Sequence, residues 1–313
     1  MGVAGVSRTV GEQRRARVGL LQVCAAGVLW GTGGLVVTVL HERDGLGAMT
    51  VSAWRMVLAA VALLVFAVAA RRWGAVRATM RAHPVPAVVV GCGTAVYQGL
   101  YFVSVLLVGV SVATVVSLGI APILAAVWEH LRARTRPSLR EAGVLVAALA
   151  GLVLISATAG DASVAPGDAP GLGLTLAVAA GVTYAATTVL GHTVARRVDP
   201  VALTTCATAA GAVLLAPFLF VAAARREPVI STSPESIALL AYLGIATMAL
   251  AYGLLYAGLR TTSGSAATVA TLLEPVSAAL LAVLLLDEHL PWQAWLGAVL
   301  ILAAVAALRP TGP

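Results

Sequence analysis

Hydrophobic residues occur along this chain in long runs that short polar connections separate. Cutting the chain at clusters of charge, proline and glycine leaves ten apolar segments, each close to the roughly 20 residues that cross a bilayer core. They lie near residues 18–40, 50–70, 85–108, 112–130, 140–157, 171–194, 200–222, 236–259, 264–286 and 292–308. The connections are too short for a soluble domain. The pattern predicts an all-α integral membrane protein with ten transmembrane helices.

The arginines are distributed unevenly between the two sides of the predicted bundle. With the N-terminus inside, sixteen fall on the cytoplasmic side, three (Arg43, Arg225 and Arg226) fall outside, and Arg55 lies within a helix. Because cytoplasmic loops of membrane proteins are enriched in basic residues, both termini are predicted to be cytoplasmic, in the cell membrane. The first apolar run is too long for a signal peptide and is expected to remain as the first helix.

An internal repeat with an offset of about 154 residues divides the chain in two. The matching stretches are Ala25–Trp30 with Ala179–Tyr184, Tyr97–Tyr101 with Tyr252–Tyr256, and Ala121–Val127 with Glu274–Leu280. Each unit holds five helices, so the second must be inverted relative to the first, as in many secondary transporters. We expect a cytoplasmic segment at 1–17, repeats at 18–157 and 171–308, a periplasmic linker at 158–170 and a cytoplasmic tail at 309–313.

Composition narrows the classes of function. Of the 313 residues, 60% are hydrophobic and 11% are charged, and all 20 basic Lys and Arg residues are arginine. The lack of lysine excludes a P-loop and Schiff-base chemistry. The three cysteines occupy separate apolar segments without metal-ligand spacing, so we expect no disulfide and no metal. The expected partners are the lipid bilayer and a small-molecule substrate, with no cofactor and no nucleic acid; a monomer and a homodimer both stay open.

The sequence resembles the EamA family of the drug/metabolite transporter superfamily. The resemblance rests on Trp30-Gly31, Trp54-Arg55, Glu274-Pro275, Glu288 and Gly297, and it extends over nearly the whole chain as two tandem units. It implies a ten-helix, inverted-repeat carrier with a central cavity. Members of this family move metabolites or drugs across the cytoplasmic membrane, often outward, and amino acids are frequent substrates.

The first repeat departs from the family pattern. Ala121 replaces the glutamate of the Glu-Pro pair, and Thr135 stands where Glu288 has its counterpart. The second repeat is therefore the better match.

Glu274 is the main candidate for substrate contact or coupling. It lies about ten residues, or about 15 Å, into its helix, near the bilayer midplane, where an unpaired carboxylate is costly. We therefore expect it to be protonated, paired, or in contact with water or substrate, which would allow coupling to protons. Pro275, and Pro122 at the equivalent position, are expected to break their helices. The alternative is a purely structural glutamate in a kinked helix.

Arg55 is the second ionisable candidate, and its sequence position leaves three roles open. It can reach the headgroups, pair with Glu42 or Asp44, or face the cavity and bind a substrate carboxylate. Glu129 and His192 lie near cytoplasmic helix ends, where a solvated or snorkelling side chain is the expected state.

Aromatic residues recur at equivalent places in the two repeats. Pairs four residues apart share a helix face, so the two repeats can bring them to one cavity. The alternative is core packing or an interfacial aromatic belt. These candidates are Trp30, Tyr97, Tyr101, Tyr184, Tyr252 and Tyr256.

We interpret the chain as a secondary transporter, an exporter of amino acids, related compounds or drugs, with no catalytic activity. An intramembrane enzyme is the alternative, but the sequence holds neither G-x-S-x-G nor H-E-x-x-H. A non-transporting scaffold would need soluble partner-binding segments. With no lysine and one candidate arginine, a highly anionic substrate is disfavoured.

Overall fold

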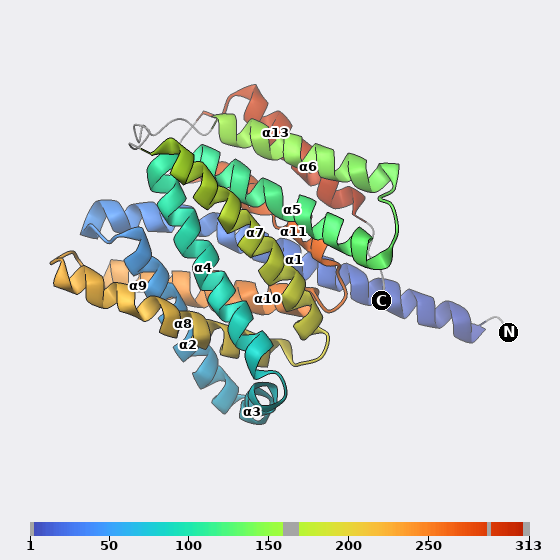
Figure 1. Cartoon of the computed structure of the whole chain (residues 1–313), viewed down its shortest axis with the longest axis horizontal. Coiled ribbons are helices and arrows are strands. Elements are labelled where there is room, and N and C mark those ends of the chain that lie inside the picture. Colours follow the sequence, from blue (N-terminus) through green and yellow to red (C-terminus); the bar gives the residue numbers. More distant parts are fainter. Residues whose placement is uncertain (1–2, 159–168, 287–288, 309–313) are drawn as a thin grey trace.

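The computed structural model describes residues 3–158, 169–286 and 289–308, and within them every regular element is a helix (Figure 1). The first repeat holds α1 (Val3–Asp44), α2 (Ala48–Ala69), α3 (Trp73–Ala82), α4 (Pro84–Val108), α5 (Val110–Ala133) and α6 (Leu139–Thr158). The second holds α7 (Pro170–Ala195), α8 (Pro200–Ala224), α9 (Pro234–Tyr242), the π-helix η1 (Leu243–Leu250), α10 (Ala251–Gly258), α11 (Gly264–Ala270), α12 (Leu273–Leu286) and α13 (Trp292–Ala307).

Among the described residues, nine helical segments are long and apolar enough to cross a membrane. The eighth consists of α9, η1 and α10, and the ninth consists of α11 and α12. The last segment, α13, is a shorter apolar helix of 16 residues that lies along α6 (Figure 1). The prediction of an all-α, multi-pass membrane protein is confirmed, and most helix ends fall within a few residues of their predicted places.

Two helical features differ from the sequence prediction. First, α1 begins at Val3, not near residue 18, and its N-terminal part projects beyond the bundle (Figure 1). Second, α3 lies between two apolar segments, in a stretch for which the hydrophobic pattern predicted no helix. It buries Val76 and Thr79, while Arg77 lies 5.5 Å above the ring of Trp73. A basic helix with one apolar face is typical of a membrane interface, which explains why no apolar run revealed it. Most of the predicted linker and Glu288 lie outside the described residues.

The helix packing follows the expected two-fold relation between the repeats. The first helix of the second repeat, α7, packs against α4 and α5 of the first repeat. In the same way the first helix of the first repeat, α1, packs against the eighth and ninth spans, which are the counterparts of α4 and α5. Three further contacts, α2 with α8, α5 with α11 and α6 with α13, join helices to their own counterparts. Packing pairs that exchange under the repeat symmetry are what two inverted five-helix units produce.

Small residues allow the helices to approach closely at these contacts. A Cβ built at Gly91 would lie 2.1 Å from the carbonyl oxygen of Ala207 on α8. Between α6 and α13, a Cβ at Gly151 would lie 2.5 Å from the Gly297 carbonyl oxygen, and one at Gly297 would lie 2.6 Å from the Gly151 carbonyl oxygen. In lipid, where burial of apolar surface gives little drive for helix association, such backbone contacts supply much of the packing energy.

One end of the bundle carries most of the arginines, among them Arg72, Arg134 and Arg197, and is called the arginine-rich end below. At this end, Arg72 forms an ion pair of 2.7 Å with Asp199. The other end is called the opposite end, and there Arg43 pairs with Glu235 at 2.5 Å. The candidate site lies between the two ends.

Candidate functional site

The ninth span is interrupted immediately before Glu274. The helix α11 ends at Ala270, two turn residues follow, and α12 starts at Leu273. The cause is Pro275, which lacks an N–H and whose ring would clash with the carbonyl of Thr271. That carbonyl instead accepts a tighter hydrogen bond of 2.9 Å from the N–H of Glu274. The break predicted at Pro275 thus falls within one turn of it.

Glu274 stands in the first turn of α12, against α1. A Cβ built at Gly31 would lie 2.4 Å from the carbonyl oxygen of Glu274, so only glycine allows this approach. The Glu274 side chain is half-buried, and among the described residues none gives its carboxyl group a hydrogen bond or an ion pair. A carboxyl group this deep in a bundle, without a protein partner, is available for a proton, water or a ligand.

Arg55 projects from α2 toward the same region. Its Nη2 donates a 3.1 Å hydrogen bond to Oγ1 of Thr247, and its Nε is buried without a partner. Of the three roles left open by the sequence, pairing with Glu42 or Asp44 is not observed; Asp44 accepts a hydrogen bond from Ser231 at the opposite end. The guanidinium is directed into the bundle.

Arg55 is held by the π-helix η1, which the sequence did not predict. Thr247 donates its own hydroxyl proton to the Leu243 carbonyl oxygen at 2.7 Å, and its carbonyl oxygen accepts 2.8 Å from Nε1 of Trp30. The wider turn of a π-helix displaces carbonyls from the regular ladder, and such bulges are frequent at functional sites. Thr247 therefore ties α1 and α2 to the eighth span.

Arg55 and Glu274 interact electrostatically, but they do not form a contact ion pair within 4.0 Å. Opposite charges attract each other in the low dielectric of the interior even without direct contact. Their counterpart positions in the other repeat do not reproduce the pair, since Ala121 matches Glu274. The buried acidic group is thus present in the second repeat only, although the helices of the two repeats are related by symmetry.

Four aromatic residues form two pairs that the repeat symmetry relates. Tyr97 stacks on Tyr184 with ring centroids 5.0 Å apart, and Tyr252 lies 4.9 Å from Trp30. The Tyr184 hydroxyl is also 2.9 Å from Oγ1 of Thr271, at the break in the ninth span. The pairs cross between repeats, so the aromatic frame joins both halves of the protein.

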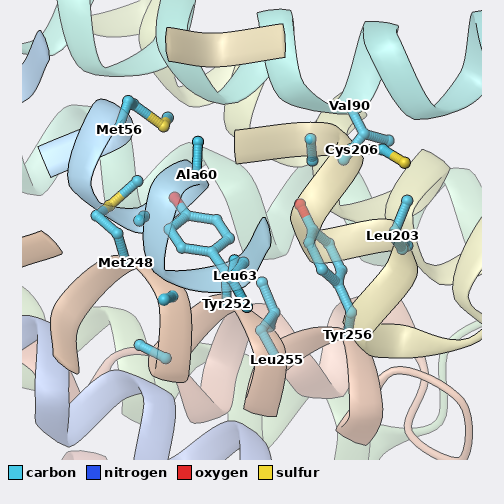
Figure 2. Close-up of a cluster of buried hydrophobic side chains, with 14 of the residues drawn as sticks. Met56, Ala60, Leu63, Val90, Leu203, Cys206, Met248, Tyr252, Leu255 and Tyr256 are labelled. Carbon is cyan, nitrogen blue, oxygen red and sulfur yellow. The ribbon is translucent and has the colours of Figure 1, made fainter. Parts of the chain in front are cut away.

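Tyr97 and Tyr252 line one small internal cavity of about 10 Å³, roughly the space for one water molecule. Tyr184 and Tyr256 line it as well. Figure 2 shows Tyr252 and Tyr256 from α10 among apolar side chains, with both hydroxyl groups directed to the same side. The shared location agrees with convergence from both repeats, and a lipid-facing aromatic belt does not describe these residues.

Two sequence candidates do not take the expected place. The Tyr101 hydroxyl is 2.7 Å from Oγ1 of Thr114, and the ring does not line the small cavity. The helix α5 continues through Pro122, so the expected break does not occur there. A proline removes one hydrogen bond from a helix, and the long flanking turns of α5 keep their helical geometry around it.

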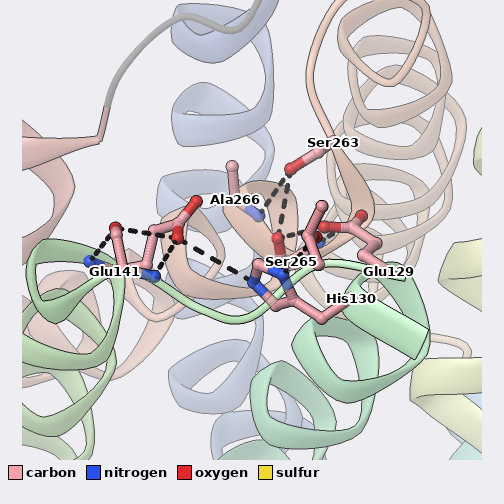
Figure 3. Close-up of polar contacts among 8 residues, drawn as sticks. Glu129, His130, Glu141, Ser263, Ser265 and Ala266 are labelled. Carbon is pink, nitrogen blue, oxygen red and sulfur yellow. Dashed lines mark hydrogen bonds and ion pairs between the residues drawn. The ribbon is translucent and has the colours of Figure 1, made fainter. Parts of the chain in front are cut away.

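Glu129 and His192 were expected to be solvated or to snorkel, and both instead form hydrogen bonds to residues of another span. Glu129 Oε1 accepts 3.0 Å from the N–H of Ser265 in α11, and Oε2 accepts the Ser265 hydroxyl (Figure 3). His192 Nδ1 lies 2.7 Å from the carbonyl oxygen of Leu259. These partners lie more than 60 positions away in the sequence, so helix position alone did not reveal them.

The two parts of the ninth span, α11 and α12, have different neighbouring helices, and residues on the two sides of the break differ in burial. The helix α11 packs against α5, α7 and α1, whereas α12 packs against α1, α6 and α13. Both parts of the ninth span thus contact helices of both repeats. On the arginine-rich side of the break Thr268 is 1% exposed and Leu272 is 1% exposed, while Glu274 just beyond the break is only half-buried.

The same architecture occurs in known proteins. Residues 17–157 and 171–309 each match the EamA-like transporter family. The chain is similar to an uncharacterized transporter, YwfM, of Bacillus subtilis (strain 168), with 29% identity over 92% of both chains. It is also similar to an uncharacterized inner membrane transporter, YicL, of Salmonella typhimurium, with 24% identity over 92% of this chain and 94% of that one.

A protein of known crystal structure shares the fold, with a TM-score of 0.76 and 20% sequence identity over 92% of this chain and 95% of that chain. The two family matches cover one repeat each and together cover most of the chain. This division agrees with the symmetric helix packing, and the relatives are transporters by name. The chain belongs to the EamA-like transporter family and is a multi-pass membrane transporter.

Proposed function

We propose that this transporter exports small amphoteric metabolites, amino acids or close relatives. In this proposal Arg55 binds the carboxylate of the substrate and Glu274 binds its ammonium group. The observation that carries this proposal is the separated pair itself. Arg55 has a buried Nε without a partner, and the carboxyl group of Glu274 has no protein partner among the described residues. A molecule with one carboxylate and one ammonium group satisfies both.

The chemistry of each residue fits one substrate group. A guanidinium offers a planar fork of donors that matches a carboxylate, and Thr247 holds that fork at 3.1 Å. A carboxylate accepts hydrogen bonds from an ammonium group. The aromatic rings of Trp30 and Tyr97 flank this region and favour cations and apolar side chains. A single arginine gives little excess positive charge, so strongly anionic substrates are disfavoured.

We further propose that the structure represents a conformation closed at the arginine-rich end, which the positive-inside rule predicts to be cytoplasmic. Support comes from the tight packing of α11 against the first repeat and from the Glu129–Ser265 contact. Toward the opposite end, Ala278, one turn beyond Glu274 on the same face, is exposed. Export then requires the reverse state, with the arginine-rich end open to load substrate.

Proton coupling at Glu274 completes the proposal. A protonated carboxyl group is neutral and holds an ammonium group weakly, whereas the ionised group holds it well, so proton and substrate compete for one site. Competition of this kind exchanges one substrate for one proton across the membrane. The acid lies beside the break in the ninth span, where movement of α11 relative to α12 can expose it to either end.

The test of substrate class is transport by the full chain reconstituted in liposomes. Leucine would be compared with its decarboxylated amine and its deaminated carboxylate. We expect leucine to compete best, by about 10- to 100-fold, because each missing group removes a charged hydrogen bond. Arg55→Gln should abolish the preference over the amine, and Glu274→Gln should abolish the preference over the carboxylate.

Arg43→Gln is the matched control, since Arg43 is exposed and paired with Glu235 away from the site. Equal competition by all three compounds in the wild-type protein would contradict the amphoteric substrate. For coupling, Glu274→Gln should keep substrate exchange between equal pools and lose acceleration by a proton gradient. Gradient-driven transport with unchanged pH dependence in Glu274→Gln would refute the coupling role.

A further inference from the structure

A second, larger cavity lies at the arginine-rich end, apart from the aromatic frame. Its volume is about 750 Å³, and it is formed between α5, α6 and α11, with Ala307 and Leu308 closing one side. Volumes of about 300–1,000 Å³ are usual for ligand sites. None of the central residues Arg55, Tyr97 or Glu274 lines it. It is called the inner groove below.

The walls of the inner groove are apolar. Ile123 and Val127 come from α5, Val144 and Leu145 from α6, and Val269 from α11. Such walls offer water few hydrogen-bond partners, so a hydrocarbon chain fills this space better than water does.

The rim of the groove carries positive charge. Arg136 and Arg140 line it, and Arg132 in the last turn of α5 and Arg134 directly after that helix are close to them in the sequence. Arg140 donates 2.8 Å to the Ala307 carbonyl oxygen, and among the described residues Arg136 has neither an ion pair nor a side-chain hydrogen bond. The rim can therefore bind an anionic group.

The acids near the rim are already bound to other groups. Glu129 accepts both donors of Ser265, and Glu141 accepts 2.7 Å from the N–H of Ser138 and 2.8 Å from its hydroxyl at the start of α6 (Figure 3). His130 lies 3.9 Å from Glu141. The two carboxylates thus bind groups within the protein, and the rim arginines remain accessible to an anionic ligand.

Exposed leucines show which phase the mouth of the groove faces. Leu131 lines the groove and is 71% exposed, and Leu139 at the start of α6 is 94% exposed. Leucines this exposed beside arginines suit the boundary of a bilayer, where the apolar side chain enters the lipid and the guanidinium stays at the headgroups. A mouth of this composition suits contact with lipid.

We propose that the inner groove is a binding site for one anionic phospholipid from the leaflet at the arginine-rich end. The phosphate lies on Arg136 and Arg140, and an acyl chain runs between α5 and α6 toward Val269. Basic pockets between transmembrane helices on the cytoplasmic side are established sites for anionic headgroups. Because α11 forms one wall, the bound lipid also supports the Glu129–Ser265 contact.

The test is native mass spectrometry of the purified full chain with phosphatidylglycerol and phosphatidylcholine of identical acyl chains. We expect the wild-type protein to retain phosphatidylglycerol about 10- to 30-fold better, from two arginines at the surface. Arg136→Gln with Arg140→Gln should remove this preference, and Arg136→Gln alone should reduce it without disturbing the bond to Ala307. Arg225→Gln with Arg226→Gln, at the opposite end, is the matched control and should change nothing.

Two further measurements decide between occupants. Ala126→Phe, which fills the groove, should lower retention of both lipids, and size-exclusion chromatography would verify that each variant stays folded. Soluble glycerol phosphate should fail to displace the lipid. Equal retention of the two lipids, a preference that survives the Arg136 and Arg140 changes, or displacement by glycerol phosphate would each overturn the proposal.

Discussion

The contact between Glu129 and Ser265 is predicted to hold the arginine-rich end closed. It joins α5 to α11, which are counterparts in the two repeats. The register that aligns Ala121 with Glu274 places Ala282 opposite Glu129 and Val112 opposite Ser265. Neither of those side chains can form a hydrogen bond, so these counterpart positions cannot repeat the contact. Removing it should shift the protein toward the state that is open at the arginine-rich end.

The expected size of the shift follows from the two hydrogen bonds. A hydrogen bond to a charged group contributes about 1.5–3 kcal/mol and a neutral one about 0.5–1.5 kcal/mol. Glu129 is half-buried, so water competes and the lower part of these ranges applies. Glu129→Gln should therefore destabilise the closed state by about 1 kcal/mol, or roughly fivefold in population. Ser265→Ala leaves the backbone donor in place and should have a comparable or smaller effect.

The populations can be measured by double electron–electron resonance between spin labels at Arg132 and Arg260. Both positions are exposed at the arginine-rich end, one at the end of α5 and one just before α11. The three native cysteines are unpaired and would be replaced by serine. The open state should give a longer distance between the two labels than the closed state, and each variant should increase the population at that longer distance. The double variant should show less than the sum of the two single effects, because each single change removes the same interaction.

Ser138→Ala is the matched control, because Ser138 bonds to Glu141 within the first repeat and does not join the two repeats. It should leave the distance distribution unchanged. Distributions that do not respond to Glu129→Gln, or single effects that add fully in the double variant, would refute the role of this contact in closure.

Three further predictions follow from other contacts. Thr247→Val should weaken binding of carboxylate-bearing substrates by about tenfold, because the guanidinium it positions loses a hydrogen bond; Thr247→Ser should restore binding in the same transport competition assay. Gly91→Ala should lower the free energy of unfolding by about 1–3 kcal/mol through overpacking against backbone, whereas Gly143→Ala, where nothing lies within 4 Å, should be neutral in thermal unfolding. Reporter fusions after Arg197 and after Arg226 should report cytoplasm and periplasm respectively; the same side for both would refute the predicted orientation.

The sequence was sufficient for features that depend on local composition. The spans could be located because a bilayer core requires about 20 apolar residues, and that requirement is met one segment at a time. The repeat was visible because equivalent residues keep their order. The interruption of the ninth span followed from Pro275, whose missing N–H acts on its own turn. The amphipathic helix α3 was missed because a short interfacial helix does not form an apolar run.

Only the tertiary structure decided which partners the candidate residues take. Arg55 had three possible roles, and its choice of Thr247 depends on a residue 192 positions away and on the π-helix that turns that hydroxyl toward it. Glu129 was expected to be solvated or to snorkel, yet α11 places Ser265 beside it. Hydropathy records how deep a residue lies in the bilayer, but not the rotation of each helix or its neighbours. Close backbone packing at glycine contacts sets those rotations, and with them the separation of Arg55 from Glu274.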